Sequence, residues 1–285
     1  MSVAIPFGAF ETVLSLDVNK DISTKIMFLR KLVNGGNVSK LQEIKGAILQ
    51  MSVPVSLTTE LTSKMKSARM PWPDKGGDDQ WNRAWQAIKK VWASKWNERA
   101  YISCKKAKLN HEDLRMAVLI QEVICGDYAF VIHTKNPLSG DTSEIYAEIV
   151  KGLGETLVGA YPGRAMSFIA KKNNLKSPIV TCYASKKIGL YCKPTIIFRS
   201  DSNGEDLGGY AGAGLYDSVL MDEEESMVLD YSNDPMMVNK AFQTSILSKV
   251  AEAGKIIETL YGCPQDIEGV VKDGMIYVVQ ARPQV

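Results

Sequence analysis

Four polar side chains interrupt two apolar runs near the end of the sequence, and their types suit phosphate chemistry. Asp266 and Glu268 lie in the first run and Gln280 and Arg282 in the second, with Lys-Asp-Gly between the runs. This pattern is typical of a β-hairpin. A carboxylate and an amide oxygen are hard ligands for Mg²⁺, and a guanidinium binds a phosphate well. The alternative interpretation is an edge hairpin with a solvent-exposed ion pair.

The length of the hairpin loop decides whether these side chains lie on one face. A two-residue loop would place Glu268 opposite Val279 and turn Gln280 to the other face, because side chains alternate along a strand. A three-residue loop, residues 272–274, places Glu268 opposite Val278 and brings the polar side chains together. The last loop residue is a glycine, which this turn prefers in left-handed conformation. We therefore predict a three-residue loop.

A second stretch with possible chemistry covers residues 199–214. An apolar strand at residues 195–198 leads into Arg199 and then into a glycine-rich segment that also carries Ser200 and Ser202. Glycines let a backbone approach a ligand closely, and an arginine can bind a phosphate through two N–H groups. The pattern GxxxxGK[ST] does not occur, so this is not a Walker A loop. The alternative is a purely structural loop.

The sequence contains few residues or motifs that suit other kinds of catalysis. His111 and His133 are the only histidines, and the GxSxG and HExxH patterns are absent. His133 lies within an apolar strand, which predicts a core histidine, whereas His111 lies in a polar stretch and is expected to be exposed. The sequence therefore argues against a hydrolase or a nucleophilic-cysteine enzyme.

The first part of the chain is predicted to be helical. Apolar residues recur at helical spacing between residues 20 and 70. Trp81, Trp85, Trp92 and Trp96 then form one stripe of a long amphipathic helix. Such a stripe favours core packing, and the alternative is a surface on which indoles stack against sugar rings.

From residue 116 onward the pattern changes to strands and hairpins. Residues 116–124 are nearly all apolar, as in a strand that is buried on both faces. Mixed helices and hairpins predict an α+β fold with mostly antiparallel sheets rather than an alternating βαβ fold. We expect one domain over residues 1–285, with a helical portion at about 14–113 and a β-rich portion at about 114–285.

Bulk composition argues against nucleic-acid and membrane partners. The 285 residues carry 34 Lys and Arg against 32 Asp and Glu, a formal net charge of +2. No strong field therefore points to nucleic acid or to a membrane surface. No apolar run approaches eighteen residues. The five cysteines form no CxxC pair, which predicts free thiols in a reduced compartment.

Three groups of motifs in this sequence resemble the nucleotide-binding domain of the plant α-glucan, water dikinase family. The resemblance runs from about residue 2 to residue 285, and the chain more distantly resembles the ATP-binding domains of pyruvate, phosphate dikinase and phosphoenolpyruvate synthase. These domains have a two-lobed ATP-grasp-like fold. The motifs are residues 199–219, residues 261–268 with 277–283, and residues 91–100, 128–134 and 152–164.

The resemblance implies a role for each candidate residue. Glu268 and Gln280 would hold Mg²⁺ on the phosphates of ATP, and Arg282 would stabilise the transferred group. Arg199 and Arg99 would face the phosphates. The remaining nucleotide contacts implied by the resemblance are Gln121, Glu122, the backbone of Val123, and Glu155.

The implied reaction passes the β-phosphate of ATP to a histidine on a separate domain and then to starch-like glucan, while the γ-phosphate goes to water. The phosphohistidine motif is absent from this sequence, and so is the lysine segment expected before residue 1. We therefore expect a catalytic domain of a larger dikinase, located in the plastid stroma or alternatively in the cytosol. The competing interpretations are the equivalent domain of a pyruvate- or phosphoenolpyruvate-using dikinase and a non-catalytic glucan-binding module.

Overall fold

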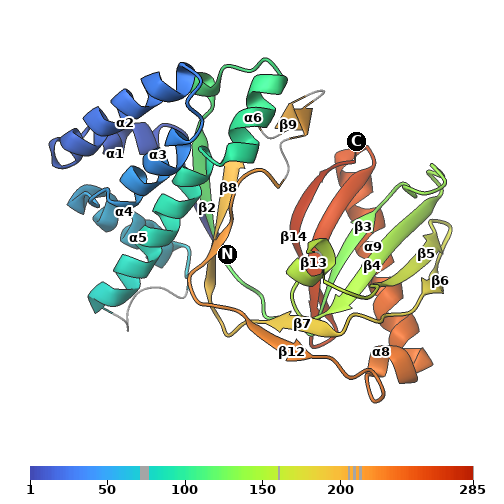
Figure 1. Cartoon of the computed structure of the whole chain (residues 1–285). Coiled ribbons are helices and arrows are strands. Elements are labelled where there is room, and N and C mark those ends of the chain that lie inside the picture. The colour runs from blue at the N-terminus through green and yellow to red at the C-terminus, as the bar shows by residue number, and fades with distance from the viewer. Residues whose placement is uncertain (71–76, 160, 205, 208–209, 212–213, 285) are drawn as a thin grey trace. The chain divides into compact units, whose positions relative to one another are not determined.

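The computed structural model describes residues 1–70, 77–159, 161–204, 206–207, 210–211 and 214–284. The chain divides into two compact units, each formed by two separate stretches of sequence (Figure 1). Unit 1 comprises Met1–Val123 and Thr195–Asp222, and unit 2 comprises Ile124–Pro194 and Glu223–Val285. The chain therefore passes between the units at three points.

Unit 1 combines a group of helices with a small antiparallel sheet. Its helices are α1 (Ala9–Ser15), α2 (Lys20–Asn34), α3 (Lys40–Leu49), α4 (Val55–Ser67), α5 (Gly77–Ser94) and α6 (Glu98–Lys106), with short 3-10 turns at Asp17–Asn19 and His111–Asp113. Its strands are β1 (Ser2–Ile5), β2 (Met116–Glu122), β8 (Ile196–Ser202), β9 (Asp206–Leu207), β10 (Tyr210–Ala211) and β11 (Val219–Leu220). The main sheet has the order β1-β2-β8-β11, and β9 pairs with β10.

The tryptophan stripe of α5 is part of the core of unit 1. Trp85, Trp92 and Trp96 are buried, and Trp81 packs partly buried against the same cluster. The indole of Trp85 donates a hydrogen bond to the carbonyl oxygen of Met51 at 2.9 Å. Core packing is therefore confirmed, and the three buried indoles are not exposed for stacking on a sugar ring.

The two faces of the main sheet of unit 1 differ in character. Val118 and Ile120 of β2 and Phe198 of β8 are fully buried, and they belong to the same core cluster as the tryptophans of α5. The intervening side chains, including Gln121 and Arg199, point to the opposite face and are only partly buried. The continuous apolar run thus forms a strand with one fully buried face.

Unit 2 is a six-stranded antiparallel sheet with one long helix. Its strands are β3 (Tyr128–His133), β4 (Glu144–Lys151), β5 (Met166–Lys171), β6 (Asn174–Cys182), β7 (Ile188–Tyr191), β12 (Glu225–Val228), β13 (Gln265–Lys272) and β14 (Met275–Pro283). Its helices are α7 (Glu155–Val158), α8 (Pro235–Val238) and α9 (Lys240–Tyr261). The sheet order is β14-β13-β3-β4-β5-β6, and β7 pairs separately with β12.

Helix α9 covers one face of this sheet (Figure 1). Its buried residues Ile246, Leu247 and Val250 pack with apolar side chains of β3, β4, β5 and β13 in one cluster. The helix ends at Gly262, whose φ of 72° gives the left-handed C-terminal cap that a glycine adopts without strain. The predicted α+β class is confirmed, and every strand pair in the described residues is antiparallel.

Both histidine predictions are wrong. His111 is not exposed: its ring packs against Trp96 and Tyr101 at centroid distances of 5.8 and 5.1 Å, and its Nε2 lies 3.0 Å from the carbonyl oxygen of Lys95. Burial lowers the pKa of His111 to about 4. His133 does not face the core, because it lies on the face of the sheet that α9 does not cover.

The free thiols predicted from the cysteine spacing are confirmed. All five cysteines are free, and the sulfur atoms of Cys125 and Cys192 lie 3.3 Å apart. Along the described part of the chain, no helix has both the length and the apolar character needed to cross a bilayer.

Candidate functional site

The terminal hairpin turns through two residues rather than three. Lys272 pairs with Met275, so that only Asp273 and Gly274 form the loop. Their φ angles are 51° and 71°, which is the pair of positive angles of a type I′ turn. The predicted left-handed glycine is confirmed, but the predicted three-residue loop is wrong. An Asp-Gly pair favours the two-residue turn so strongly that it sets the loop length here.

A β-bulge nevertheless brings the predicted side chains to one face. Gly269 pairs with Val278, whereas the preceding residue Glu268 pairs with Gln280. Val279 is thus an extra residue that shifts the register by one and returns Gln280 to the face of Glu268. The convergence predicted from the sequence is present, although its cause is a bulge within the strand.

Arg282 is held on the same face by an acidic neighbour. It lies directly opposite Asp266, and its Nε and Nη2 atoms donate to the Oδ2 atom of Asp266 at 3.1 and 2.9 Å. The other carboxylate oxygen of Asp266 lies 3.7 Å from the Nδ1 atom of His133. The side chain of Asp266 is 18% exposed and that of Arg282 is 37% exposed. Asp266 therefore fixes the guanidinium while leaving it partly open to solvent.

The polar face extends onto the neighbouring strands. Tyr146 stacks on His133 at a centroid distance of 6.2 Å, and its hydroxyl donates to Glu148 at 2.8 Å. Ser167 also donates to Glu148, at 3.3 Å. The face of the sheet that α9 does not cover thus carries a group of polar side chains around His133 and Glu148, whereas a small apolar cluster near α7 occupies another part of the same face.

The pair formed by Glu268 and Gln280 has the chemistry and spacing of a partial Mg²⁺ site. Residues directly opposite in an antiparallel pair have Cβ atoms about 4.5–5.5 Å apart. A carboxylate oxygen and an amide oxygen can then bind one cation, because Mg²⁺ prefers oxygen ligands and keeps waters and phosphate oxygens as the rest. Nowhere in the described ranges do three or more His, Cys, Asp or Glu side chains form a metal cluster.

In unit 1, Arg199 lies within a strand and not at its end. Strand β8 continues to Ser202, and Arg199 pairs with Leu119 of β2. Its Nη1 atom donates to the Oε1 atom of Gln121 at 3.3 Å. The structure thus brings together two residues that the sequence assigned to different parts of a nucleotide site. The predicted strand end at residue 198 is therefore wrong. Because Arg199 lies inside β8, the hydrogen bonds of the sheet hold the backbone on both sides of it.

The segment that follows Gln121 forms the connection out of unit 1. Glu122 donates its backbone N–H to the carbonyl oxygen of Met1 at 3.2 Å, and Val123 donates to the carbonyl oxygen of Thr195 at 2.9 Å. Both side chains are half-buried. Because the N–H of Val123 has this partner, a ligand would contact this residue through its carbonyl oxygen or its side chain.

Arg99 and Glu155 are both exposed. Arg99 lies in the first turn of α6, and no ion pair to another described residue involves it. Glu155 is the first residue of the short helix α7, and its charge contributes to the raised pKa of Glu224, which is caused first by burial. Arg99 belongs to unit 1 and Glu155 to unit 2.

The glycine-rich segment after Arg199 lies partly outside the described residues. Its ends are held by two asparagines that sequence reasoning did not single out. Asn203 accepts a hydrogen bond from the N–H of Arg115 at 2.7 Å, and Asn97 donates to the carbonyl oxygen of Leu215 at 3.3 Å. The sequence offers only a weak signal for either residue: Asn97 stands two residues before Arg99 in the motif at residues 91–100, and Asn203 stands in the motif at residues 199–219.

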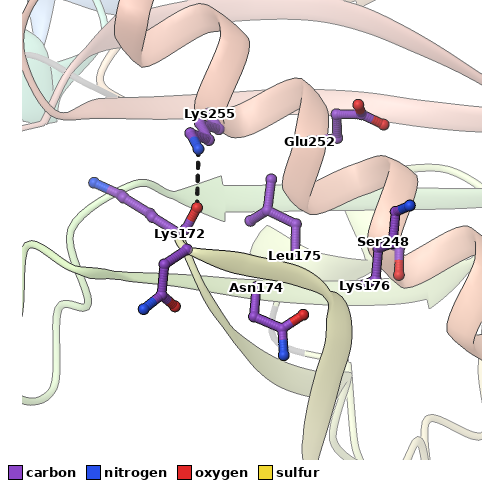
Figure 2. A pocket seen from close by; sticks show the side chains of 8 residues that line it. Lys172, Asn174, Leu175, Lys176, Ser248, Glu252 and Lys255 are labelled. Atoms are coloured by element: carbon purple, nitrogen blue, oxygen red, sulfur yellow. Dashed lines mark hydrogen bonds between the residues drawn. The ribbon is translucent and has the colours of Figure 1, made fainter.

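A pocket of about 290 Å³ lies in unit 2 between the β5–β6 turn and α9 (Figure 2). Lys255 donates to the carbonyl oxygen of Lys172 at 2.9 Å, and the ammonium of Lys172 pairs with Glu258 at 2.6 Å. Two of the lysines in the pocket therefore have protein partners, and the pocket shares no residue with the predicted site.

These features can be compared with known proteins. Residues 7–177 match the family described as "Pyruvate phosphate dikinase, AMP/ATP-binding domain". The match covers more than half of the chain, so the chain belongs to this family. The ATP-grasp-like α+β class predicted from the sequence agrees with this membership.

Several curated proteins are similar over the full length of the chain. It is 67% identical to "Alpha-glucan water dikinase 2" of Arabidopsis thaliana, with all of this chain and 22% of that protein covered. It is 63% identical to "Alpha-glucan water dikinase, chloroplastic" of Solanum tuberosum, with 99% of this chain and 19% of that protein covered. A "Phosphoenolpyruvate synthase" of Pyrococcus furiosus is 26% identical over 69% of this chain. The chain spans about a fifth of the length of the dikinases that it matches.

Proposed function

We propose that this chain is the ATP-binding catalytic domain of an α-glucan, water dikinase. The observation that carries the proposal is the bulge at Val279, which places Glu268 opposite Gln280 and beside the fixed guanidinium of Arg282. A bulge that turns a polar side chain toward such a face is typical of functional sites. The similarity to dikinases over the whole chain supports the same conclusion.

In the proposed site, each residue contributes binding or orientation. Glu268 and Gln280 hold Mg²⁺ through their side-chain oxygens, and the bound metal ion neutralises charge on the phosphate oxygens. Arg282, oriented by Asp266, donates N–H groups to the transferred phosphoryl group. Glu268, Gln280 and Arg282 all belong to the hairpin, so a single element presents both metal ligands and a phosphate-binding group.

Unit 1 carries a second group of proposed nucleotide contacts, and unit 2 carries one more, Glu155. Arg199 is oriented by Gln121 and binds phosphate oxygens, and the exposed Arg99 adds a second positive charge. Gln121, Glu122 and Val123 contact the adenine, with the carbonyl oxygen or side chain of Val123 in place of its N–H. Glu155 is the remaining proposed nucleotide contact.

The proposed reaction follows from the family's chemistry. The β-phosphate of ATP passes to a histidine on a separate domain and then to an α-glucan hydroxyl, and the γ-phosphate goes to water. Residues 1–285 form one ATP-binding domain of a larger enzyme in this proposal, and the phosphohistidine domain and the glucan are its partners. We place the enzyme in the plastid stroma, and the cytosol is the alternative. The reason is that two of the dikinases with more than 60% identity, from Arabidopsis thaliana and Solanum tuberosum, carry the word "chloroplastic" in their names.

Isothermal titration calorimetry with MgATP tests the site. Glu268→Gln should weaken MgATP binding at least about tenfold, because it removes the charged metal ligand. The affinity for ATP measured in EDTA should change much less. Glu252→Gln is a matched control: it removes one carboxylate from the exposed side of α9 in the same unit and should leave both affinities unchanged.

Two outcomes would contradict the proposal. The first is a parent chain that binds no MgATP under conditions in which it is folded. The second is a Glu268→Gln variant that retains the magnesium dependence of the parent, since Glu268 would then not be a metal ligand.

A further inference from the structure

The residue before helix α6 is an asparagine that does not cap the helix. Asn97 occupies the N-cap position with an extended backbone (φ −60°, ψ 136°), yet its side chain makes no hydrogen bond to the N–H groups of the first turn. Asparagine is among the best N-cap residues, and a capping bond stabilises the helix that it begins. The side chain therefore forgoes this local bond for other partners.

The amide of Asn97 joins three segments of unit 1. Its Oδ1 atom accepts from the ammonium of Lys45 on α3 at 2.5 Å. Its Nδ2 atom donates to the carbonyl oxygen of Leu215 at 3.3 Å and to the Oδ1 atom of Asp217 at 2.9 Å. The acceptor faces a cation and the donors face a carbonyl and a carboxylate, so the orientation of the amide is fixed by chemistry.

These contacts hold the exit of the glycine-rich segment. Leu215 and Tyr216 are buried in the core of unit 1, and Asn97 bonds to the backbone carbonyl of Leu215 and to the side-chain carboxylate of Asp217. The entrance is held in a similar way by Asn203, which accepts from the N–H of Arg115 and donates to the carbonyl oxygen of Asp113.

We propose that Asn97 is a positioning residue for nucleotide binding. It fixes the start of α6, the helix that carries Arg99 in its first turn, against α3 and residues 215–217. This inference rests on the proposed function, because it assumes that Arg99 binds the nucleotide. Pre-organising a binding residue raises affinity because the ordering is then not part of the binding cost.

Two measurements on the full 285-residue chain test the proposal. In hydrogen exchange without nucleotide, the backbone amides of residues 214–217 should exchange faster in Asn97→Ala than in the parent. In calorimetry, Asn97→Ala should weaken MgATP binding about tenfold, the effect of losing hydrogen bonds to a charged partner. Asn239→Ala is the matched control, because Asn239 does cap its helix, α9 in unit 2, by accepting from the N–H of Phe242 at 3.0 Å. It should lower stability and leave MgATP affinity unchanged.

A charge exchange distinguishes this role from a general loss of stability. Asn97→Asp places a carboxylate against Asp217 and should also weaken MgATP binding about tenfold. With Asp217→Asn added, the new amide at position 217 can donate to the new carboxylate at position 97, which reverses the direction of the parent's hydrogen bond. The double variant should recover MgATP affinity to within about threefold of the parent, the remainder being the lost bond to Leu215.

Unchanged exchange at residues 214–217 in Asn97→Ala would overturn the proposal, and so would an unchanged dissociation constant for MgATP. Failure of the double variant to recover affinity would also overturn it. A parent chain that binds no MgATP would refute the proposed function instead, and the exchange measurement would then still decide whether Asn97 holds the segment.

Discussion

The bulge that presents Glu268 and Gln280 leaves no room for a side chain at the neighbouring Gly269. A Cβ atom placed there would lie 2.3 Å from the Cζ atom of Phe130 and 2.6 Å from the carbonyl oxygen of Tyr277. Ordinary carbon contacts are about 3.5–4.0 Å. The ring of Phe130 would therefore have to move by more than about 1 Å, although it is 1% exposed and tightly packed. Gly269→Ala is the perturbation that tests this arrangement.

The magnitude follows from two opposing effects. Overpacking a close-packed core typically costs about 1–3 kcal/mol, and the clash with backbone at Tyr277 places this site at the upper end. Replacing glycine reduces the conformational freedom of the unfolded chain, which stabilises by about 0.4–1 kcal/mol. We therefore expect Gly269→Ala to lower the free energy of unfolding by about 2 kcal/mol. It should also weaken MgATP binding, because the strand must shift next to Glu268.

Urea unfolding followed by far-ultraviolet circular dichroism measures the change. Tryptophan fluorescence would not suffice, because all five tryptophans lie in unit 1 and Gly269 lies in unit 2. Gly46→Ala is a matched control: Gly46 lies within α3, and a Cβ atom there meets nothing within 4 Å. It should raise stability by about 0.5–1 kcal/mol. If Gly269→Ala unfolds within about 0.5 kcal/mol of the parent, the close packing around the bulge is not as described.

Two further predictions concern groups whose pKa is shifted by burial. The pKa of His111 is lowered to about 4, so the unfolded chain binds more protons than the folded chain between pH 4 and about 6.5. The free energy of unfolding should therefore fall as the pH falls through this window. In urea titrations, His111→Gln should remove about 2–3 kcal/mol of that pH dependence. A pH dependence equal in parent and variant would contradict this. Burial and then the hydrogen bond between Cys192 and Cys125 raise the pKa of Cys192 to about 12. Iodoacetamide at pH 8 should therefore modify Cys192 far more slowly than glutathione, as followed by peptide mass spectrometry; equal rates would rule out the partly buried thiol pair.

The fold follows from sequence where a pattern depends on local spacing alone. The tryptophan stripe predicts a buried helix face because its period matches the helix, and Trp92, at 1% exposure, lies fully in the core. The predictions for the two histidines are wrong because the burial of a side chain depends on contacts with residues that are distant in sequence. His111 stands among polar residues, yet its ring is enclosed by Trp96 and Tyr101, and its neighbour Lys95 also has its pKa lowered by burial, to about 8. No local pattern encodes these contacts.

The candidate site shows the same division. The pairing of Arg199 with Gln121 depends on how β8 aligns with β2, and the two residues are 78 positions apart in the chain. A sequence pattern can identify each as a polar residue at a strand, but the register between distant strands is set by core side chains such as Ile120, which pairs with Phe198. The contacts of Asn97 are harder still to predict from the sequence, because its position before α6 predicts a helix-capping hydrogen bond that the structure does not contain.

The hairpin shows how much a periodicity argument can establish. For Glu268 and Gln280 to share a face, one extra residue is needed somewhere between them, and side-chain alternation alone requires this. It does not say where the residue goes. The Asp273-Gly274 pair takes the two-residue turn, while packing against α9 requires Ile276 and Ala281 to face the helix. These two positions are five apart, an odd number, so a regular strand cannot turn both to the same face. The extra residue must therefore lie within β14, and it does so opposite the junction of Glu268 and Gly269, where the absence of a side chain leaves space for the bulge. The same constraint that packs the core on one face thus aligns the polar groups on the other.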